Sequence, residues 1–100
     1  DEISFTLQPG QGAEVKLEMK QGAKATYEWV ATDEVNYDLH GDGSGKETSY
    51  KKGRGVKKDD GSLTAAFDGS HGWFWRNRTR APVTITVKVS GQQASMKRVL

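Results

Sequence analysis

The chain has 100 residues, with fifteen Lys and Arg, thirteen Asp and Glu, two His and no Cys, and this length corresponds to one domain. The missing cysteines exclude disulfide scaffolds, thiolate zinc sites, iron–sulfur clusters and Cys nucleophiles. A net charge of +2 is too small to indicate a nucleic-acid partner, and no apolar run approaches the roughly 20 residues that cross a bilayer.

Alternation of apolar and polar residues dominates the first forty positions and predicts four half-buried strands. Turn residues separate them at Pro9–Gly12 and Gln21–Gly22, and a short hairpin is expected at Thr32–Asp33. The glycine-rich segment Gly41–Gly45 should be a loop. The apolar positions of the four strands are Ile3, Phe5 and Leu7; Val15, Leu17 and Met19; Ala25, Tyr27 and Trp29; and Val35, Tyr37 and Leu39.

The segment Lys46–Asp60 is rich in positive charge, and glycines interrupt it. This composition predicts an exposed hairpin or flap. Its charges explain a solvated edge, where Lys prevents strand-to-strand aggregation, better than they explain binding to phosphate polymers or to an anionic membrane surface. The basic residues are Lys51, Lys52, Arg54, Lys57 and Lys58.

The last third of the chain alternates again. A turn at Asp60–Gly61 precedes a strand with Leu63, Ala65 and Phe67, a second turn lies at Asp68–Ser70, and the most regular strand runs from Val83 to Val89. Seven or eight short strands, each with one apolar face, are the pattern of an all-β, antiparallel sandwich or barrel. Of these two, we expect a jelly-roll-like β-sandwich over residues 1–91. Residues 92–100 are polar and are expected to be a C-terminal tail, frayed or serving as a linker.

A family resemblance begins at the segment His71-Gly72-Trp73-Phe74-Trp75-Arg76-Asn77, which the strand Val83–Val89 follows. The two together resemble the end of a GOLD-type (emp24-like) β-sandwich. Combined with Asn36-Tyr37-Asp38-Leu39-His40-Gly41, the same segment resembles bacterial proteins described as transmembrane anchor proteins, over nearly the whole chain. That resemblance implies a periplasmic domain held by an N-terminal membrane helix, and because the chain opens at Asp1 rather than Met, we expect such an anchor upstream.

The aromatic run Trp73-Phe74-Trp75 places large rings on both faces of one strand, so at least one ring must point away from the core. Phe74 shares its face with Arg76 and Arg78, an arrangement typical of surfaces that contact sugars or proteins. The alternative is that Trp73 and Trp75 fill the sandwich interior while a loop such as Lys46–Asp60 covers Phe74. The candidate ligand-binding residues are therefore Trp73, Phe74, Trp75, Arg76 and Arg78.

A metal site is the second candidate, because the chain has only His40 and His71 as histidines and each lies next to a Gly. Strand alternation places Asp38, His40 and Asp42 on one side. If His71 lies on a loop at the same end, the set suits Zn, Ni or Cu(II). The competing interpretation, in which the carboxylates bind loop amides and the histidines bind turns, is favoured because no His-x-His or His-Glu-x-x-His spacing occurs.

No Gly-x-Ser-x-Gly elbow and no pair of Glu placed as acid and base stand out, so we predict that the protein is not an enzyme. The sequence favours a non-catalytic ectodomain that binds a protein or a glycan near a membrane, on its periplasmic or extracytoplasmic face. No cofactor and no nucleic acid are expected. The alternative function is a transition-metal-binding accessory domain that uses His40 and His71.

Overall fold

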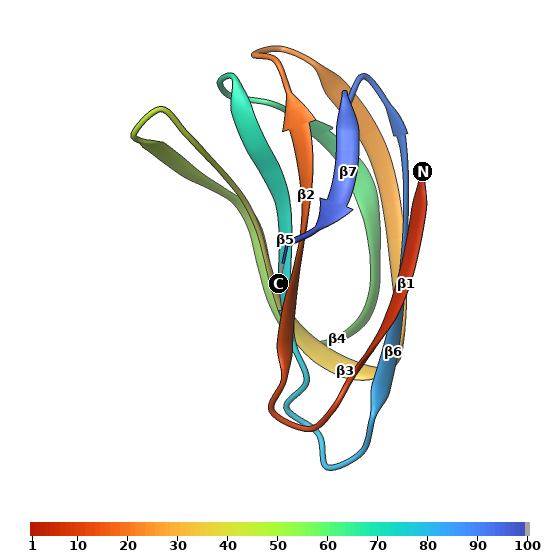
Figure 1. Cartoon of the computed structure of the whole chain (residues 1–100). Coiled ribbons are helices and arrows are strands. Elements are labelled where there is room, and N and C mark those ends of the chain that lie inside the picture. Colours follow the sequence, from red (N-terminus) through yellow and green to blue (C-terminus); the bar gives the residue numbers. More distant parts are fainter. Residues whose placement is uncertain (100) are drawn as a thin grey trace.

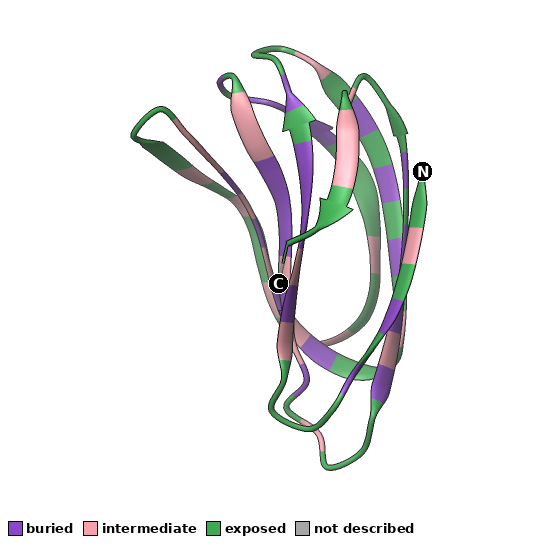
Figure 2. Cartoon of the chain, in the orientation of Figure 1, coloured by how far each residue is buried: buried purple, intermediate pink, exposed green. Residues whose placement is uncertain are grey.

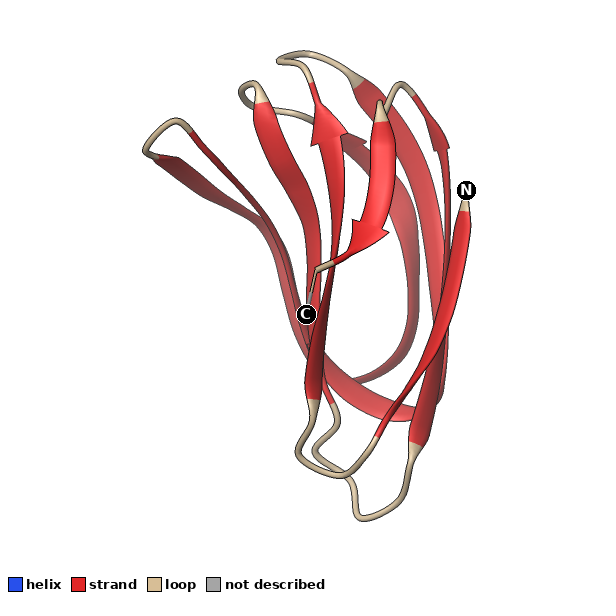
Figure 3. Cartoon of the chain, viewed as in Figure 1, coloured by secondary structure: helices blue, strands red, loops and turns tan. Residues whose placement is uncertain are grey.

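The computed structural model describes residues 1–99 and consists of seven antiparallel strands with no helix among those residues (Figure 3). No helix that is long and apolar enough to cross a membrane occurs in this described part of the chain. The prediction of an all-β, antiparallel fold is therefore confirmed. The strands are β1 Glu2–Leu7, β2 Gly12–Met19, β3 Lys24–Gly43, β4 Lys46–Thr64, β5 Gly69–Arg76, β6 Val83–Gly91 and β7 Ser95–Arg98.

The strands form one sheet that is nearly closed into a barrel (Figure 1). Its order is β1-β6-β3-β5-β2-β7, with β4 along the other side of β3. Residues 25–31 of β3 pair with β6, whereas residues 36–42 pair with β5. The long β3–β4 hairpin thus passes from one half of the sheet to the other. We call the part of the sheet that contains β1, β6 and residues 25–31 of β3 the β1–β6 half. The part that contains β5, β2, β7 and residues 36–42 of β3 is the β5–β2 half.

Two expectations about the middle of the chain were wrong. Thr32–Asp33 is not a hairpin, because β3 continues through it as one strand. The expected turn at Asp60–Gly61 lies within β4, which pairs with β3 along most of its length. The segment Lys46–Asp60, expected to be an exposed hairpin or flap, is largely exposed and belongs to the second strand of the β3–β4 hairpin. The pairing of β3 with β4 shifts register between Val30 and Val35, where the chain crosses between the two halves. A strand bends at such an irregularity without reversing direction.

The core lies between the two halves and is built from the inward-facing residues of the alternating pattern. Burial alternates along the strands as bands of buried and exposed residues (Figure 2). Trp29, Trp73 and Trp75 are the largest fully buried side chains, and Trp73 stacks on Trp75 with ring centroids 5.7 Å apart. Aromatic rings on the inward-facing positions therefore supply the largest side chains of a core whose other members are aliphatic.

The C-terminal segment is more ordered than a frayed tail. Its residues Ser95–Arg98 form β7, which pairs with β2 and so extends the β5–β2 half. The guanidinium of Arg98 lies 4.8 Å from the ring centroid of Phe5 in β1. This contact joins the edge strands β1 and β7 of the two halves.

Candidate functional site

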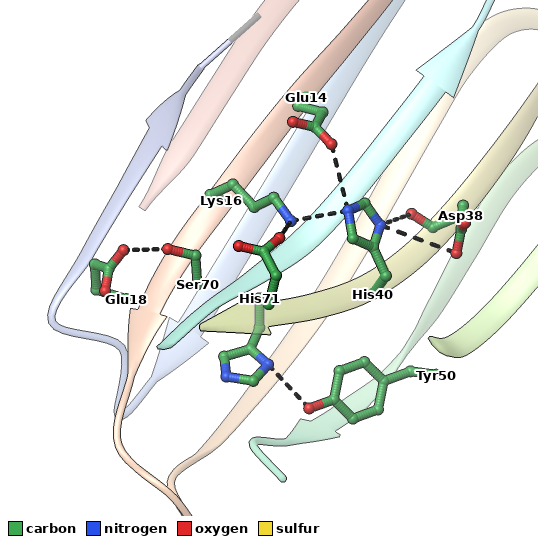
Figure 4. Close-up of polar contacts among 9 residues, drawn as sticks. Glu14, Lys16, Glu18, Asp38, His40, Tyr50, Ser70 and His71 are labelled. Carbon is green, nitrogen blue, oxygen red and sulfur yellow. Dashed lines mark hydrogen bonds and ion pairs between the residues drawn. The ribbon is translucent and has the colours of Figure 1, made fainter. Parts of the chain in front are cut away.

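A polar network crosses the outer face of the β5–β2 half (Figure 4). Lys16 Nζ donates hydrogen bonds to Nε2 of His40 and to Oδ2 of Asp42, both at 2.8 Å. An ammonium group has no acceptor, so Nε2 of His40 accepts and Nδ1–H donates to the backbone oxygen of Asp38 at 3.1 Å. Oε2 of Glu14 lies 3.3 Å from the same Nε2. Residues from β2 and β3 are thereby fixed relative to one another.

Gly72 of β5 makes this crossing possible. It lies between the two strands, in register with Lys16 on β2 and with His40 on β3. A Cβ at this position would overlap the backbone oxygen of Val15, so no side chain fits there. The Lys16 side chain, which is 9% exposed, can therefore reach across β5 to its partners.

The Asp42 carboxyl group is held in its charged form. The hydrogen bond from Lys16 is the main reason that its pKa lies below the usual value, and the positive charge of Lys16 adds to this effect. Partial burial of the carboxyl group acts in the opposite direction. The Lys16–Asp42 pair is therefore maintained at neutral pH.

His71 does not join this network, because it lies on the opposite face of the same sheet. Register pairs Gly41 with His71 and His40 with Gly72, so alternation directs His40 outward and His71 inward. His71 is fully buried, and its Nε2–H donates to the backbone oxygen of Phe67 at 2.9 Å. In neutral imidazole, its Nδ1 accepts from the hydroxyl of Tyr50 at 2.9 Å.

The proposed metal ligands therefore do not form one site. Asp38, His40 and Asp42 share the outer face as alternation predicts, but a strand's thickness separates them from His71. Nε2 of His40 faces the ammonium of Lys16, which occupies the position a metal ion would need. Across residues 1–99, no group of three His, Cys, Asp or Glu is arranged to hold a metal ion.

The aromatic strand divides between the two faces. Trp73 and Trp75 are 0% exposed and lie in the core, so neither presents a ring to a ligand, and the alternative interpretation holds for them. Phe74 faces outward and is half-buried, and the guanidinium of Arg76 lies 5.1 Å from its ring centroid. Arg78 is exposed beyond the end of β5. The segment Lys46–Asp60 is not a loop folded over Phe74, because it belongs to the paired strand β4.

Sequence reasoning missed Glu14, Lys16 and Asn77. The first two lie in an ordinary alternating strand, and only the register of β2 with β5 brings them to His40. Asn77 is fully buried, and its Nδ2 donates to the backbone oxygens of Leu7 and Ala81 at 3.0 and 2.8 Å. Its place on the face of Trp73 and Trp75 was a usable signal, since a buried amide requires such partners.

Comparison with known proteins supports the fold. No protein-family model matches the chain, and no curated protein matches it in sequence. A crystal structure of the Yersinia pseudotuberculosis-derived mitogen is similar, with a TM-score of 0.67 at 11% identity over 90% of this chain and 83% of that one. The solution structure of a de novo designed double-stranded β-helix is similar, with a TM-score of 0.53 at 19% identity over 90% and 99%. These similarities concern the fold alone and give no support to the GOLD-type or membrane-anchor resemblance.

Proposed function

We propose that this protein is a non-catalytic binding module that holds a carbohydrate on the outer face of the β5–β2 half. The observation that carries the proposal is the position of Phe74. Of the nine aromatic residues in the chain, it is the one on an outward-facing strand position, and it lies in register between Glu14 and Asp38. A ring surrounded by hydrogen-bonding groups suits sugars, which present both apolar C–H faces and hydroxyls.

The polarity of this face favours a carbohydrate over a protein partner. The centre of a stable protein interface is depleted in charge and rich in apolar side chains. Among residues 1–99, the exposed large apolar side chains are Val30 and Val99. Val30 lies on the other half of the sheet, and Val99 is a single apolar side chain among the charged residues near Glu14. The groups that surround Phe74 are the carboxylates of Glu14 and Asp38 and the guanidinium of Arg76. Arg76 has five N–H donors, and one of them is bonded to the backbone oxygen of Gly10 at 2.7 Å.

The Lys16 network prepares the face for binding. Its side chains are already held in place by hydrogen bonds before any ligand arrives. Ordering flexible side chains costs about 0.5–1.5 kcal/mol each on association. A face that is already ordered avoids that cost, which favours binding of a weakly interacting polar ligand.

A glycan array tests the proposal with three forms of the protein: the native chain, Phe74→Ala, and Val30→Ala as a matched control on the other half of the sheet. We expect the native chain and Val30→Ala to bind the same glycans and Phe74→Ala to lose at least tenfold in affinity. Circular dichroism confirms that the variants are folded. Equal binding by all three forms, or binding to no glycan, would overturn the proposal, and a Phe74-dependent protein partner would replace the carbohydrate.

We also propose a cellular location for this binding module. The resemblance to membrane-anchored bacterial proteins supports a periplasmic or other extracytoplasmic position, with the domain displayed near a membrane by an upstream anchor. Protease treatment of cells that produce the full-length protein provides the test. We expect this domain to be cleaved once the outer permeability barrier is opened, while a cytoplasmic marker stays intact. If the protease cleaves neither this domain nor the cytoplasmic marker, the result would contradict an extracytoplasmic location.

A further inference from the structure

Two hollows of similar size flank Phe74 on the outer face of the β5–β2 half. The first, between β3 and β4, has a volume of about 330 Å³. The second, over β2, has a volume of about 310 Å³. The polar side chains of the first are Asp38, His40, Glu47, Thr48, Ser49 and Lys52. Those of the second are Glu14, Lys16, Glu18, Asp42, Ser70 and Lys97.

Phe74 and the Lys16 network lie between the hollows. Glu14 lines the second hollow, Asp38 lines the first, and both are in register with Phe74. The neighbouring row runs from Lys16 across Gly72 to His40, so the network bridges the same two hollows (Figure 4). One ligand chain that crosses the strands can therefore contact a hollow, the Phe74–Arg76 stack and the other hollow in sequence.

The distance between the two hollows sets the length of the ligand. Neighbouring strands lie about 4.8 Å apart, and β2 is separated from the β3–β4 pair by β5, so the hollows are roughly 10–12 Å apart. A single sugar ring cannot occupy both positions. A chain needs about three rings to place one in each hollow and one over Phe74.

The charge of the two hollows selects the kind of chain. With neutral histidine, each hollow has one more carboxylate than it has ammonium groups. A glycan that carries uronate or sulfate groups would meet net repulsion in both hollows. An uncharged glycan instead finds carboxylate acceptors together with Lys, Ser and Thr donors.

We infer that the ligand is an uncharged oligosaccharide of three or more rings, laid across the strands with its ends in the two hollows. This inference rests on the proposed carbohydrate-binding function, because it specifies the substrate class of the same face. It assigns Lys52 and Lys97 to opposite ends of the ligand. Each lies at the exposed rim of its own hollow.

Calorimetry with malto-, cello- and chitooligosaccharides, each from the monosaccharide to the hexasaccharide, provides the test. We expect affinity for at least one series to rise steeply up to the chain that fills both hollows and then to level off. Lys52→Ala and Lys97→Ala should each weaken binding of the longest chain about fivefold, the effect of losing one hydrogen bond. Lys88→Ala, on the outer face of the other half, serves as the matched control and should leave affinity unchanged.

Amide chemical shifts add a readout that does not depend on affinity. We expect short chains to perturb residues of one hollow and long chains to perturb Ser49 and Ser70 together. Affinity that does not change with length, perturbation confined to one hollow, or equally tight binding of heparin or polygalacturonate would overturn this inference and leave the proposed function in place. Absence of binding to every glycan of the array and of these series would overturn both.

Discussion

The side chain of Lys16 in β2 crosses β5 and connects to two residues of β3. Its ammonium group is largely buried and is bonded to His40 and Asp42. A buried charge is stable only when it is paired and hydrogen-bonded. The negative charge of Asp42 is therefore as important to this network as the lysine itself, and the network should respond to acid.

The first prediction concerns the titration of Asp42. Its folded-state pKa is lowered, so the ionised carboxylate stabilises the fold, and that contribution is fully present above the ordinary Asp pKa of about 3.9. It is lost as the pH falls through the lowered value. In Lys16→Met, the hydrogen bond that is the main cause of the lowering is removed. We therefore expect the titration midpoint of Asp42 to rise in this variant, as measured by the chemical shift of its side-chain carboxyl carbon.

Lys97→Met is the matched control for this experiment. Lys97 is in register with Lys16 on the neighbouring strand β7, but it is exposed and its ammonium group is not the cause of the Asp42 shift. This variant should leave the midpoint of Asp42 unchanged. An Asp42 midpoint that is the same in Lys16→Met as in the native chain would show that the Lys16–Asp42 hydrogen bond does not persist in solution.

At the scale of elements, alternation predicted the strands but not how far they continue. β1, β2 and β6 lie close to their expected positions because each has an uninterrupted period of two. Thr32–Asp33 and Asp60–Gly61 both have turn-forming composition. Pairing with β3 overrides it at Asp60–Gly61, whereas Thr32–Asp33 lies in the irregularity between Val30 and Val35, where the strand continues without reversing. The β-strand preference of a segment depends strongly on its neighbours, and these neighbours come from distant parts of the chain.

The candidate site, like the strands, could be predicted from the sequence only in part. Alternation along one strand correctly placed Asp38, His40 and Asp42 together, and it separated Phe74 from its two Trp neighbours. It gave no information on which strands are adjacent. The contacts of Glu14 and Lys16 with β3 depend on β5 lying between β2 and β3, a property of the topology and not of either segment.

The second prediction concerns the bend of β4 around the core. Gly53 is in register with Tyr37, and a Cβ on Gly53 would overlap the Tyr37 ring and lie 3.0 Å from Cγ2 of Val56. Tyr37 is buried and cannot move away easily. Gly53→Ala should therefore lower the free energy of unfolding by about 1–3 kcal/mol, the usual cost of overpacking.

Urea denaturation measures this effect, and Lys52→Ala is the control. The Lys52 side chain is exposed, so its removal should change the free energy of unfolding by less than about 0.5 kcal/mol. A Gly53→Ala variant as stable as Lys52→Ala would mean that β4 does not pack against Tyr37 as described. The distinction matters because β4 forms one wall of the hollow that contains Ser49 and Lys52.

At the scale of the molecule, two edges determine how nearly the sheet closes. On one side, β4 pairs with β3 in both halves, and Lys51 Nζ lies 2.9 Å from Oδ1 of Asp59, which links distant positions of that strand. On the other side, the edge strands β1 and β7 belong to different halves and are far apart in sequence. Closure there depends on contact between the chain's two terminal segments, which are separated by almost the whole sequence.

The third prediction tests that closure through Arg98. Its guanidinium lies over the ring of Phe5, which in turn contacts Trp75 with ring centroids 5.6 Å apart. Arg98→Ala removes the cation–π contact and uncovers part of the core, so we expect a loss of about 1 kcal/mol in the free energy of unfolding. Lys97→Ala, one residue away on the outer face, should have almost no effect on the urea midpoint. If residues 95–98 were a frayed tail, both variants would unfold at the urea midpoint of the native chain. A lower midpoint for Arg98→Ala alone would support the contact of β7 with β1.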